Sequence, residues 1–261
     1  MEEDLKKVFN NKKSKKLERG IAFPTCISVN HIFGHYSPMS DESTKLEEGD
    51  LAKIDLGCHL DGFVAQAAHT IIVSSDSNLK TKNRKADAVL AAYNAFLAAT
   101  RQIREGSTNN SVTEVIAKVC ADYEVNPVEG VLSHKVKRHL IDGNDVIINK
   151  ETPEQKVEEY TFQPGDVFGL DIYVSTGEGK PKEGDYRTTV YKRELDTQYN
   201  LKLKSSRTFF QEINKKYPTL PFSIRTFEDT TAAKVGVKEC LAHDLLTPYP
   251  VLVEKAGEFV A

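Results

Sequence analysis

The chain has 261 residues, of which 39% are hydrophobic and 28% charged, and its 35 Lys and Arg against 38 Asp and Glu leave a net charge of −3. This composition excludes a disordered or fibrous protein and a globally basic nucleic-acid binder, although a local basic face is compatible with it. No apolar run approaches the ~18–20 residues of a membrane-spanning helix, and the charged start lacks a secretory signal. Widely separated cysteines, Cys26, Cys58, Cys120 and Cys240, predict an intracellular protein with free thiols.

The chain opens with a basic run and continues as strands. Lysines and an arginine crowd residues 4–19, which predicts either a solvated chain end or a segment that touches RNA or directs nuclear import. β-like residues follow over 21–36. Two further strands, 51–60 and 63–73, flank Asp61-Gly62, the preferred dipeptide of a two-residue turn, so the sequence predicts a β-hairpin here.

Two helices are predicted to complete the first half. Apolar residues recur every three or four positions over 80–104, which predicts an amphipathic helix closed by Gly106. Ser111 and Glu114 form a capping-box pattern, so a second helix is expected to start there and to end near residue 123, before Pro127.

The second half repeats this plan. A turn at 163–166 precedes a predicted strand over 167–176, and another strand is predicted over 186–192. Helices are expected near 202–216 and 226–246, the first ended by Pro218 and the second by Pro248. A last hairpin begins at 251–253 and is cut four residues after its turn, and for that reason we expect the natural domain to continue beyond Ala261.

The two halves share one pattern around an acidic residue. Gly49 stands six residues before Asp55, and Gly165 stands six residues before Asp171; in each half a turn feeds an acid-bearing strand, and two helices follow. This order predicts an α+β fold in which a duplicated αβ unit is arranged about a pseudo-twofold axis, with both acids facing one central site. We therefore expect one domain over 1–261, incomplete at both ends, with halves of about 20–125 and 128–261.

The predicted hairpin places Asp55 and Gln66 as diagonal neighbours on one face, roughly 7–8 Å apart. Asp55 and Asp171 each lie between apolar residues, where a lone carboxylate is costly unless it is hydrogen-bonded or binds a metal. Together with a histidine such as His134, they are compatible with a carboxylate-rich metal site. A pair of dications about 3.5–4 Å apart needs several anionic ligands, however, and Gln66 is neutral. Charge alone therefore favours two buried acids satisfied by backbone donors.

Long stretches of the chain resemble a known superfamily. GIAFPTCISVNHIFGHYSP (20–38) and EGDLAKIDLGCHLDG (48–62) resemble the methionine aminopeptidases of the pita-bread superfamily, close to the type-2 enzymes. EGVLSHKVKRHLIDG (129–143) and RTTVYKR (187–193) resemble its non-peptidase branch more closely, the proliferation-associated (ErbB-receptor-binding) proteins. Three shorter stretches also resemble the proliferation-associated proteins: STGEGK (175–180), FED (227–229) and EKAGEFVA (254–261). The resemblance implies two pseudo-symmetric αβ halves around a central, curved, mainly antiparallel sheet.

The resemblance also assigns positions to the metal site of the active enzymes, which use Asp, Asp, His, Glu and Glu. The first ligand matches Asp55, the second falls on Gln66, the third matches His134, and the fourth falls on Asp171, one methylene shorter than Glu. The fifth would lie a few residues beyond the end of the chain. These four residues are therefore expected to be vestigial metal-site positions that hold no metal, and no catalytic residue or cofactor is expected.

Two positions match histidines that contact substrate in the active enzymes. The first matches His35, which is expected in a vestigial substrate cleft, and the second falls on Asp142. The chain also begins later than the family members do. The resemblance implies a catalytically inactive protein that binds structured RNA, ribosomal particles and protein partners and acts in the control of growth or ribosome biogenesis.

Lysines supply the candidate RNA or phosphate contacts. The basic start and a hairpin tip at 177–182 could touch phosphates, and Lys135 and Lys137 would share one face if that segment is extended. The candidate residues are Lys12, Lys13, Lys15, Lys16, Lys135, Lys137, Lys180 and Lys182. Because no recognition-module motif is present, contacts to shape and phosphate are expected rather than base readout.

Three functions remain open at this point. The preferred one is the inactive RNA-binding protein, a monomer without membrane contacts that is found in the cytoplasm and in the nucleus or nucleolus. The alternative is an active metal-dependent methionine aminopeptidase that uses Asp55, His134 and Asp171. A third is a cleft, with His35 at its mouth, that binds peptide termini without hydrolysis.

Overall fold

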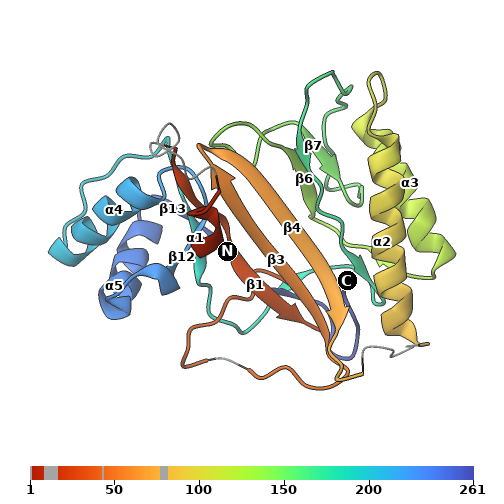
Figure 1. The fold of residues 1–261 in the computed structure, drawn as a ribbon, viewed down its shortest axis with the longest axis horizontal. Coiled ribbons are helices and arrows are strands. Elements are labelled where there is room, and N and C mark those ends of the chain that lie inside the picture. Colours follow the sequence, from red (N-terminus) through yellow and green to blue (C-terminus); the bar gives the residue numbers. More distant parts are fainter. Residues whose placement is uncertain (1, 9–16, 43, 77–81) are drawn as a thin grey trace.

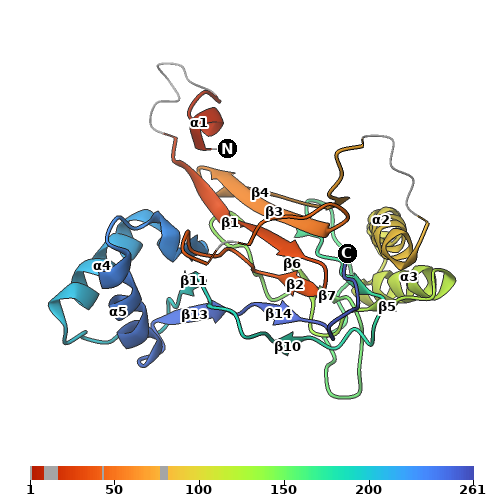
Figure 2. The same cartoon turned by 90° about the horizontal axis from the view of Figure 1, so that it is seen from below.

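A computed structural model describes residues 2–8, 17–42, 44–76 and 82–261. A three-stranded sheet lies at its centre, and two pairs of packed helices lie at opposite ends of the molecule (Figures 1 and 2). The first half contains α1 (Glu2–Leu5), β1 (Arg19–Val29), β2 (Ile32–Gly34), β3 (Leu51–Leu60), β4 (Phe63–Ile72), α2 (Arg84–Gln102) and α3 (Asn109–Asp122).

The second half is built from short strands and a second helix pair. Its first strands are β5 (Asn126–Pro127), β6 (Leu132–Lys135), β7 (Val146–Ile148), β8 (Phe168–Gly169), β9 (Val174–Ser175), β10 (Lys182–Glu183) and β11 (Val190–Arg193). After them come α4 (Lys204–Lys216), β12 (Phe222–Ser223), a 3₁₀ turn (Ile224–Thr226), α5 (Thr230–Leu241), β13 (Leu246–Tyr249) and β14 (Leu252–Val253). All pairings between the named strands are antiparallel.

The hairpin of β3 and β4 is confirmed in its register. Leu60 pairs with Phe63 across the turn, and this is the first of ten consecutive pairs that reach the far end of both strands. Asp61 and Gly62 both have positive φ, 53° and 82°, which is the backbone of a type I′ turn. Because β1 pairs with the other edge of β3, the sheet order is β1-β3-β4, with β4 at the edge.

The helix pair of the first half packs through small residues. α2 buries a stripe of alanines at helical spacing, Ala88, Ala91, Ala95 and Ala99, and these contribute to one core cluster with α3. The predicted start of α3 at Ser111 is wrong. Thr108 is the N-cap, and its hydroxyl accepts a hydrogen bond from the Ser111 N–H, so α3 begins two residues earlier.

The acid-bearing strand of the second half is not continuous. The predicted strand over 167–176 is wrong, since β8 and β9 are separated by 170–173. The Ser133 hydroxyl, on β6, accepts from the Asp171 N–H at 2.8 Å and lies 3.3 Å from its carbonyl oxygen. The Ser133 hydroxyl therefore replaces the backbone groups of a neighbouring strand as the hydrogen-bond partner of Asp171. As a result, the Asp171 carboxyl lies in an irregular segment and not in a strand.

Two proline-based expectations have different outcomes. Pro218 follows α4 closely, as predicted, and α4 ends at Lys216. Pro248 does not end α5, which stops at Leu241; it lies in β13 instead. β13 is an edge strand of the sheet β12-β11-β13, a position in which the missing N–H of proline is tolerated.

The second helix pair encloses an aromatic core. Phe209 on α4 packs against Phe222 and Phe227, whose ring centroids lie 6.5 and 4.8 Å from its own. Gly236 on α5 lets the helices approach, because a Cβ there would lie 2.5 Å from the Phe209 ring. The acid-bearing segments lie between this core and that of α2 and α3. Within the described residues no helix is long and apolar enough to cross a bilayer.

Candidate functional site

Four elements bring the expected site positions together. Asp55 lies on β3, Gln66 on β4, His134 on β6, and Asp171 follows β8. His134 pairs with Gly169 of β8, and a Cβ on Gly169 would lie only 2.8 Å from Gln66 Oε1, so β4 approaches the β6–β8 sheet closely here. The site is therefore assembled from both halves of the chain, as the duplicated pattern predicts.

The two acids, Asp55 and Asp171, both have raised pKa values. Burial raises the pKa of the Asp55 carboxyl to about 6. Asp171 is an exposed residue, but the protein packed around its carboxyl desolvates it, and this desolvation, followed by the charge of Asp55, raises its pKa to about 7. Burial and then these same carboxylates raise the pKa of the Tyr173 hydroxyl well above its usual range. No ion pair joins either acid to a Lys, Arg or His among the residues with coordinates.

His134 is oriented by a backbone carbonyl. Its Nδ1 lies 3.0 Å from the Gly143 oxygen, and because a carbonyl can only accept, Nδ1 donates this hydrogen bond. Histidines that bind metals are commonly held in this way. The same arrangement also satisfies a histidine in a protein interior, so this residue does not decide the nature of the site.

His35 lies in an aromatic cluster and not beside a charged group. Its φ is 64°, an unusual backbone for a non-glycine residue, and its Nδ1 donates to the Pro250 oxygen at 3.0 Å. Its ring centroid lies 5.2 Å from Tyr249, edge-on, and 6.0 Å from Phe23. Burial lowers the pKa of His35, which keeps the ring neutral. The strained backbone is fixed by these contacts.

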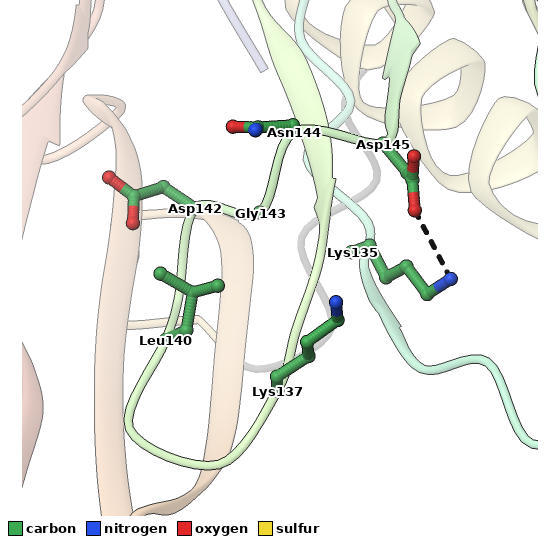
Figure 3. A pocket seen from close by; sticks show the side chains of 7 residues that line it. All are labelled: Lys135, Lys137, Leu140, Asp142, Gly143, Asn144 and Asp145. Atoms are coloured by element: carbon green, nitrogen blue, oxygen red, sulfur yellow. Dashed lines mark ion pairs between the residues drawn. The ribbon is translucent and has the colours of Figure 1, made fainter.

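A pocket of about 440 Å³ opens beside this region (Figure 3). Asp142, which takes the place of the second expected histidine, lines it and forms an ion pair with Lys192. The Oδ1 atom of Asp142 is buried and has no hydrogen-bond partner in the part of the chain that the structure describes. Gly143 connects the pocket to His134, whose Nδ1–H it accepts. The remaining lining residues are Lys135, Lys137, Leu140, Asn144 and Asp145.

Lys135 and Lys137 both line this pocket, but only Lys137 is exposed. The Lys135 ammonium lies 2.8 Å from Asp166 and 3.1 Å from Asp145, and it donates to the Tyr160 hydroxyl at 2.7 Å. Its charge is therefore neutralised inside the protein, an arrangement that argues against its predicted role as an RNA contact. The hydrogen bond to Asp166 is the main cause that raises the pKa of Lys135.

Asp166→Asn tests this internal network. Burial works to raise the pKa of the Asp166 carboxyl, but hydrogen bonds from Lys135, Tyr160 and the Gln163 N–H outweigh it and lower the pKa to about 2. A depressed acid pKa contributes stability that is present above about pH 4 and lost as the pH falls to 2. We expect the substitution to lower the unfolding free energy by about 1–2 kcal/mol at pH 7, after allowance for solvent screening, and to have little effect near pH 2.5.

Urea denaturation at both pH values measures this effect. Asp145→Asn is the matched control, since Asp145 pairs with the same ammonium but its side chain is 39% exposed, and a smaller loss is expected. An equal loss for Asp166→Asn at both pH values would contradict the assignment.

Of the other predicted phosphate contacts, two are exposed and four lie outside the described residues. Lys180 and Lys182 are exposed, and Lys182 lies in β10. Lys12, Lys13, Lys15 and Lys16 lie outside the described residues. At the hairpin turn, the Glu18 carbonyl accepts a hydrogen bond from the Asp61 N–H at 2.7 Å.

Sequence reasoning missed Lys53, a buried lysine on β3. Its ammonium donates to the Asn30 and Val260 carbonyls at 3.0 and 2.8 Å and is 5% exposed. Burial lowers the pKa of Lys53 to about 7. It fastens the last residues of the chain to β3, two residues from Asp55. The available signal was a lysine between two apolar residues, Ala52 and Ile54, in a predicted interior strand.

Comparison with known proteins places the chain in one family. The model of metallopeptidase family M24 matches residues 1–196. The chain belongs to this family. Proliferation-associated protein A of Dictyostelium discoideum is 49% identical over 94% of this chain and 63% of its own length. ERBB-3 BINDING PROTEIN 1 of Arabidopsis thaliana is 46% identical over 100% of this chain and 66% of its own.

A solved structure supports the same placement. The structure of a thermophilic Arx1 matches the M24 chain with a TM-score of 0.89 and 29% identity, covering 100% of this chain and 75% of that one. These findings confirm the pita-bread α+β fold and the place of the chain among the proliferation-associated, ErbB-3-binding relatives. The chain spans 63–66% of the length of the first two relatives.

The residues present do not fit the metal pair of an active M24 peptidase. Gln66 offers an amide in place of a carboxylate, and desolvation, followed by the charge of Asp55, raises the pKa of Asp171. Within the described residues no group of three or more His, Cys, Asp or Glu is arranged to hold a metal ion. Two dications need more negative charge than these side chains supply.

Proposed function

We propose that this M24 protein is a catalytically inactive binding factor whose partners are structured RNA or ribosomal particles, together with other proteins, in the control of growth or ribosome biogenesis. The names of its relatives support a role outside peptide hydrolysis, since they refer to proliferation and to ErbB-3 binding. Gln66 and the uncompensated acids support the loss of catalysis. RNA partners of this kind suit a protein of the cytoplasm and of the nucleus or nucleolus.

The observation that carries the RNA assignment is the exposed face of α4. The residues on this face are Lys204, Arg207, Thr208, Gln211, Asn214 and Lys215. Their spacing follows the helix repeat, and the opposite face buries Phe209 and Ile213. The acid of this helix, Glu212, is only half-exposed and forms an ion pair with Lys216.

This face suits the phosphate backbone of a folded RNA. Three cations attract phosphates, while amide and hydroxyl groups can contact phosphate oxygens and 2′-hydroxyls in a shallow groove. The Arg207 guanidinium is also fixed by hydrogen bonds to the Leu201 and Lys202 carbonyls at 2.9 and 2.7 Å. α4 lies at the outer end of the molecule, away from α2 and α3, where a large particle can reach it (Figure 1).

The test is to neutralise two lysines of this face. We expect the double variant Lys204→Gln/Lys215→Gln to bind an RNA stem-loop about 5- to 30-fold more weakly at 0.1 M salt and to lower the slope of log K against log salt by about 2. Fluorescence anisotropy over a KCl series measures both quantities. Arg101→Gln/Lys118→Gln is the matched control, because these exposed residues lie on α2 and α3 at the opposite end.

Two results would contradict the proposal. One is a wild-type protein that does not bind the stem-loop at low salt, or a control pair that weakens binding as much as the α4 pair does. The other is release of methionine from short peptides in the presence of Co²⁺ or Mn²⁺, which would restore the active-peptidase alternative.

A further inference from the structure

A second pocket lies beside α3, at the end of the molecule away from α4 (Figures 1 and 2). It has a volume of about 360 Å³ and opens between α3, Pro127 of β5 and the segment that follows β7. Its α3 residues share one face of the helix, because they recur every three or four positions: Asn110, Thr113, Glu114 and Ala117. The facing wall consists of Asn149, Lys150 and Glu151.

The elements around this pocket are held together by hydrogen bonds. The Thr113 hydroxyl donates to the Ile148 carbonyl at 2.6 Å, which ties α3 to β7. β5 pairs with one edge of β9, and Ala261 exchanges both of its backbone hydrogen bonds with Val174 at the other edge. The last described residues therefore lie across β9 from the wall that Pro127 forms, and they do not line the pocket.

Asn149 brings an unused acceptor to the pocket wall. This residue is 2% exposed, and its Nδ2 donates to the Val128 and Tyr173 carbonyls at 3.0 and 2.8 Å. These two bonds fix the orientation of the amide, so Oδ1 is the atom that still needs a partner. Among the described residues nothing donates to this Oδ1. Because buried polar groups normally have a partner, the unused acceptor points to a hydrogen-bond donor on a ligand.

The charges around the pocket favour a cation. Lys150 is already neutralised, because its ammonium lies 2.9 Å from Glu129. Glu151 has only an exposed contact of 3.7 Å with Lys156, a kind of ion pair that contributes little. The exposed Glu114 forms no ion pair within the described part of the chain. The pocket therefore offers two carboxylates and an amide oxygen, a set of acceptors that repels a phosphate and attracts a cationic donor.

A guanidinium matches this set better than an ammonium does. Its N–H donors lie in one plane, so it can bind a carboxylate through two bonds and also reach an amide oxygen, while its stem packs on groups such as Ala117 and Pro127. We propose, on the basis of the protein-binding role proposed above, that this pocket binds an arginine side chain of a protein partner through Glu114, Glu151 and the Asn149 Oδ1.

The test is an NMR titration of the protein with the blocked peptide GSRSG. We expect saturable shifts of the Ala117 and Glu151 amide signals with a Kd of about 1 mM. The matched probe replaces arginine by citrulline, which keeps the shape and lacks the charge, and it is expected to bind at least about tenfold more weakly. A lysine peptide is expected to bind about threefold more weakly than the arginine peptide. Equal binding of either replacement, or no saturable shift at these residues, would overturn the proposal.

Two substitutions on the exposed face of α3 locate the site. Glu114→Gln removes one carboxylate and is expected to weaken binding of the arginine peptide about three- to fivefold. Ala117→Trp fills the pocket and is expected to abolish binding. Lys118→Trp is the matched control, because Lys118 is also exposed but does not line the pocket. Thermal melts check that each variant is folded. Undiminished binding by folded Ala117→Trp would contradict the proposed site.

RNA binding separates this pocket from the α4 face. Ala117→Trp is expected to bind the RNA stem-loop as the wild type does, and Lys204→Gln/Lys215→Gln is expected to bind the arginine peptide as the wild type does. A wild type that binds the peptide and not the RNA would contradict the RNA assignment alone. A wild type that binds the RNA and not the peptide would overturn the arginine site alone.

Discussion

Gln66→Asp is expected to make the stability of the protein depend on divalent cations. The new carboxylate would stand diagonally across from Asp55 on β3 and close to the segment that bears Asp171. Two unit charges about 7 Å apart repel by about 2 kcal/mol at an effective dielectric of about 20. Because Gln66 is exposed, we expect a loss of about 1–2 kcal/mol at pH 8 without metal.

Addition of Mn²⁺ or Co²⁺ is expected to reverse this loss. A third carboxylate gives the site enough negative charge for one cation, with His134 Nε2 as a further donor. Binding to the folded state alone stabilises it by about 1.4 kcal/mol at a metal concentration tenfold above Kd. Differential scanning fluorimetry with and without metal measures the effect. The wild type is expected not to respond.

Ala65→Asp is the matched control for this substitution. Ala65 is the exposed neighbour of Gln66 on β4, but its side chain points to the opposite face of the strand. It adds the same charge outside the site, so no response to metal is expected. A wild-type protein whose melting temperature rises with metal as much as that of Gln66→Asp would show that the native residues already hold a cation, and the proposed loss of catalysis would fail.

The parts of the fold that sequence could predict are those set by local chemistry. The β3–β4 register follows from Asp61-Gly62 alone, because a two-residue turn fixes which residues face each other. That register places Gln66 relative to Asp55 without further information. The helix repeat of α2 is likewise contained in its own sequence, and its ends differ from the prediction by only a few residues.

The errors have distant causes. The strand through Asp171 is interrupted by the hydroxyl of Ser133, 38 residues earlier in the chain. The ion pairs of Lys135 with Asp145 and Asp166, which come from two other segments, were not foreseen from the sequence either. In each case a long-range partner competes with a local preference, and a single sequence contains no signal of such a partner.

The central site combines retained geometry with lost charge. Its positions converge as they would in a peptidase, since β6, β8 and the β3–β4 hairpin still meet, and His134 is still oriented by Gly143. The balance of charge differs from that of a dication site, because Gln66 is a neutral amide and the described residues place no ion-pair partner beside the two carboxyls, whose pKa values are raised. The fold is therefore no guide to the activity, and the electrostatics of the site decide it.

The raised pKa values of Asp55 and Asp171 predict that these two acids make the folded protein less stable as the pH rises. The folded-state pKa values of Asp55 and Asp171, about 6 and about 7, lie above the value of ~3.9 for an unfolded Asp. Between these values the folded protein binds more protons than the unfolded chain, so stability falls as the pH rises. The unfavourable contribution is complete above about pH 7 and absent below about pH 4. Paired acids such as Asp166 behave in the opposite way.

Asp171→Asn isolates this contribution. The amide cannot ionise, and the backbone bond to Ser133 is unchanged, so we expect the variant to be more stable than the wild type by about 1–2 kcal/mol at pH 8, an estimate reduced because water reaches Asp171. The difference should shrink as the pH falls below 7 and should still be measurable at pH 5, because it disappears only near pH 4, where the unfolded acid is protonated as well. Urea denaturation at pH 5, 6.5 and 8 measures it. Destabilisation by Asp171→Asn at pH 8 would mean that a cation balances this carboxylate in the native protein.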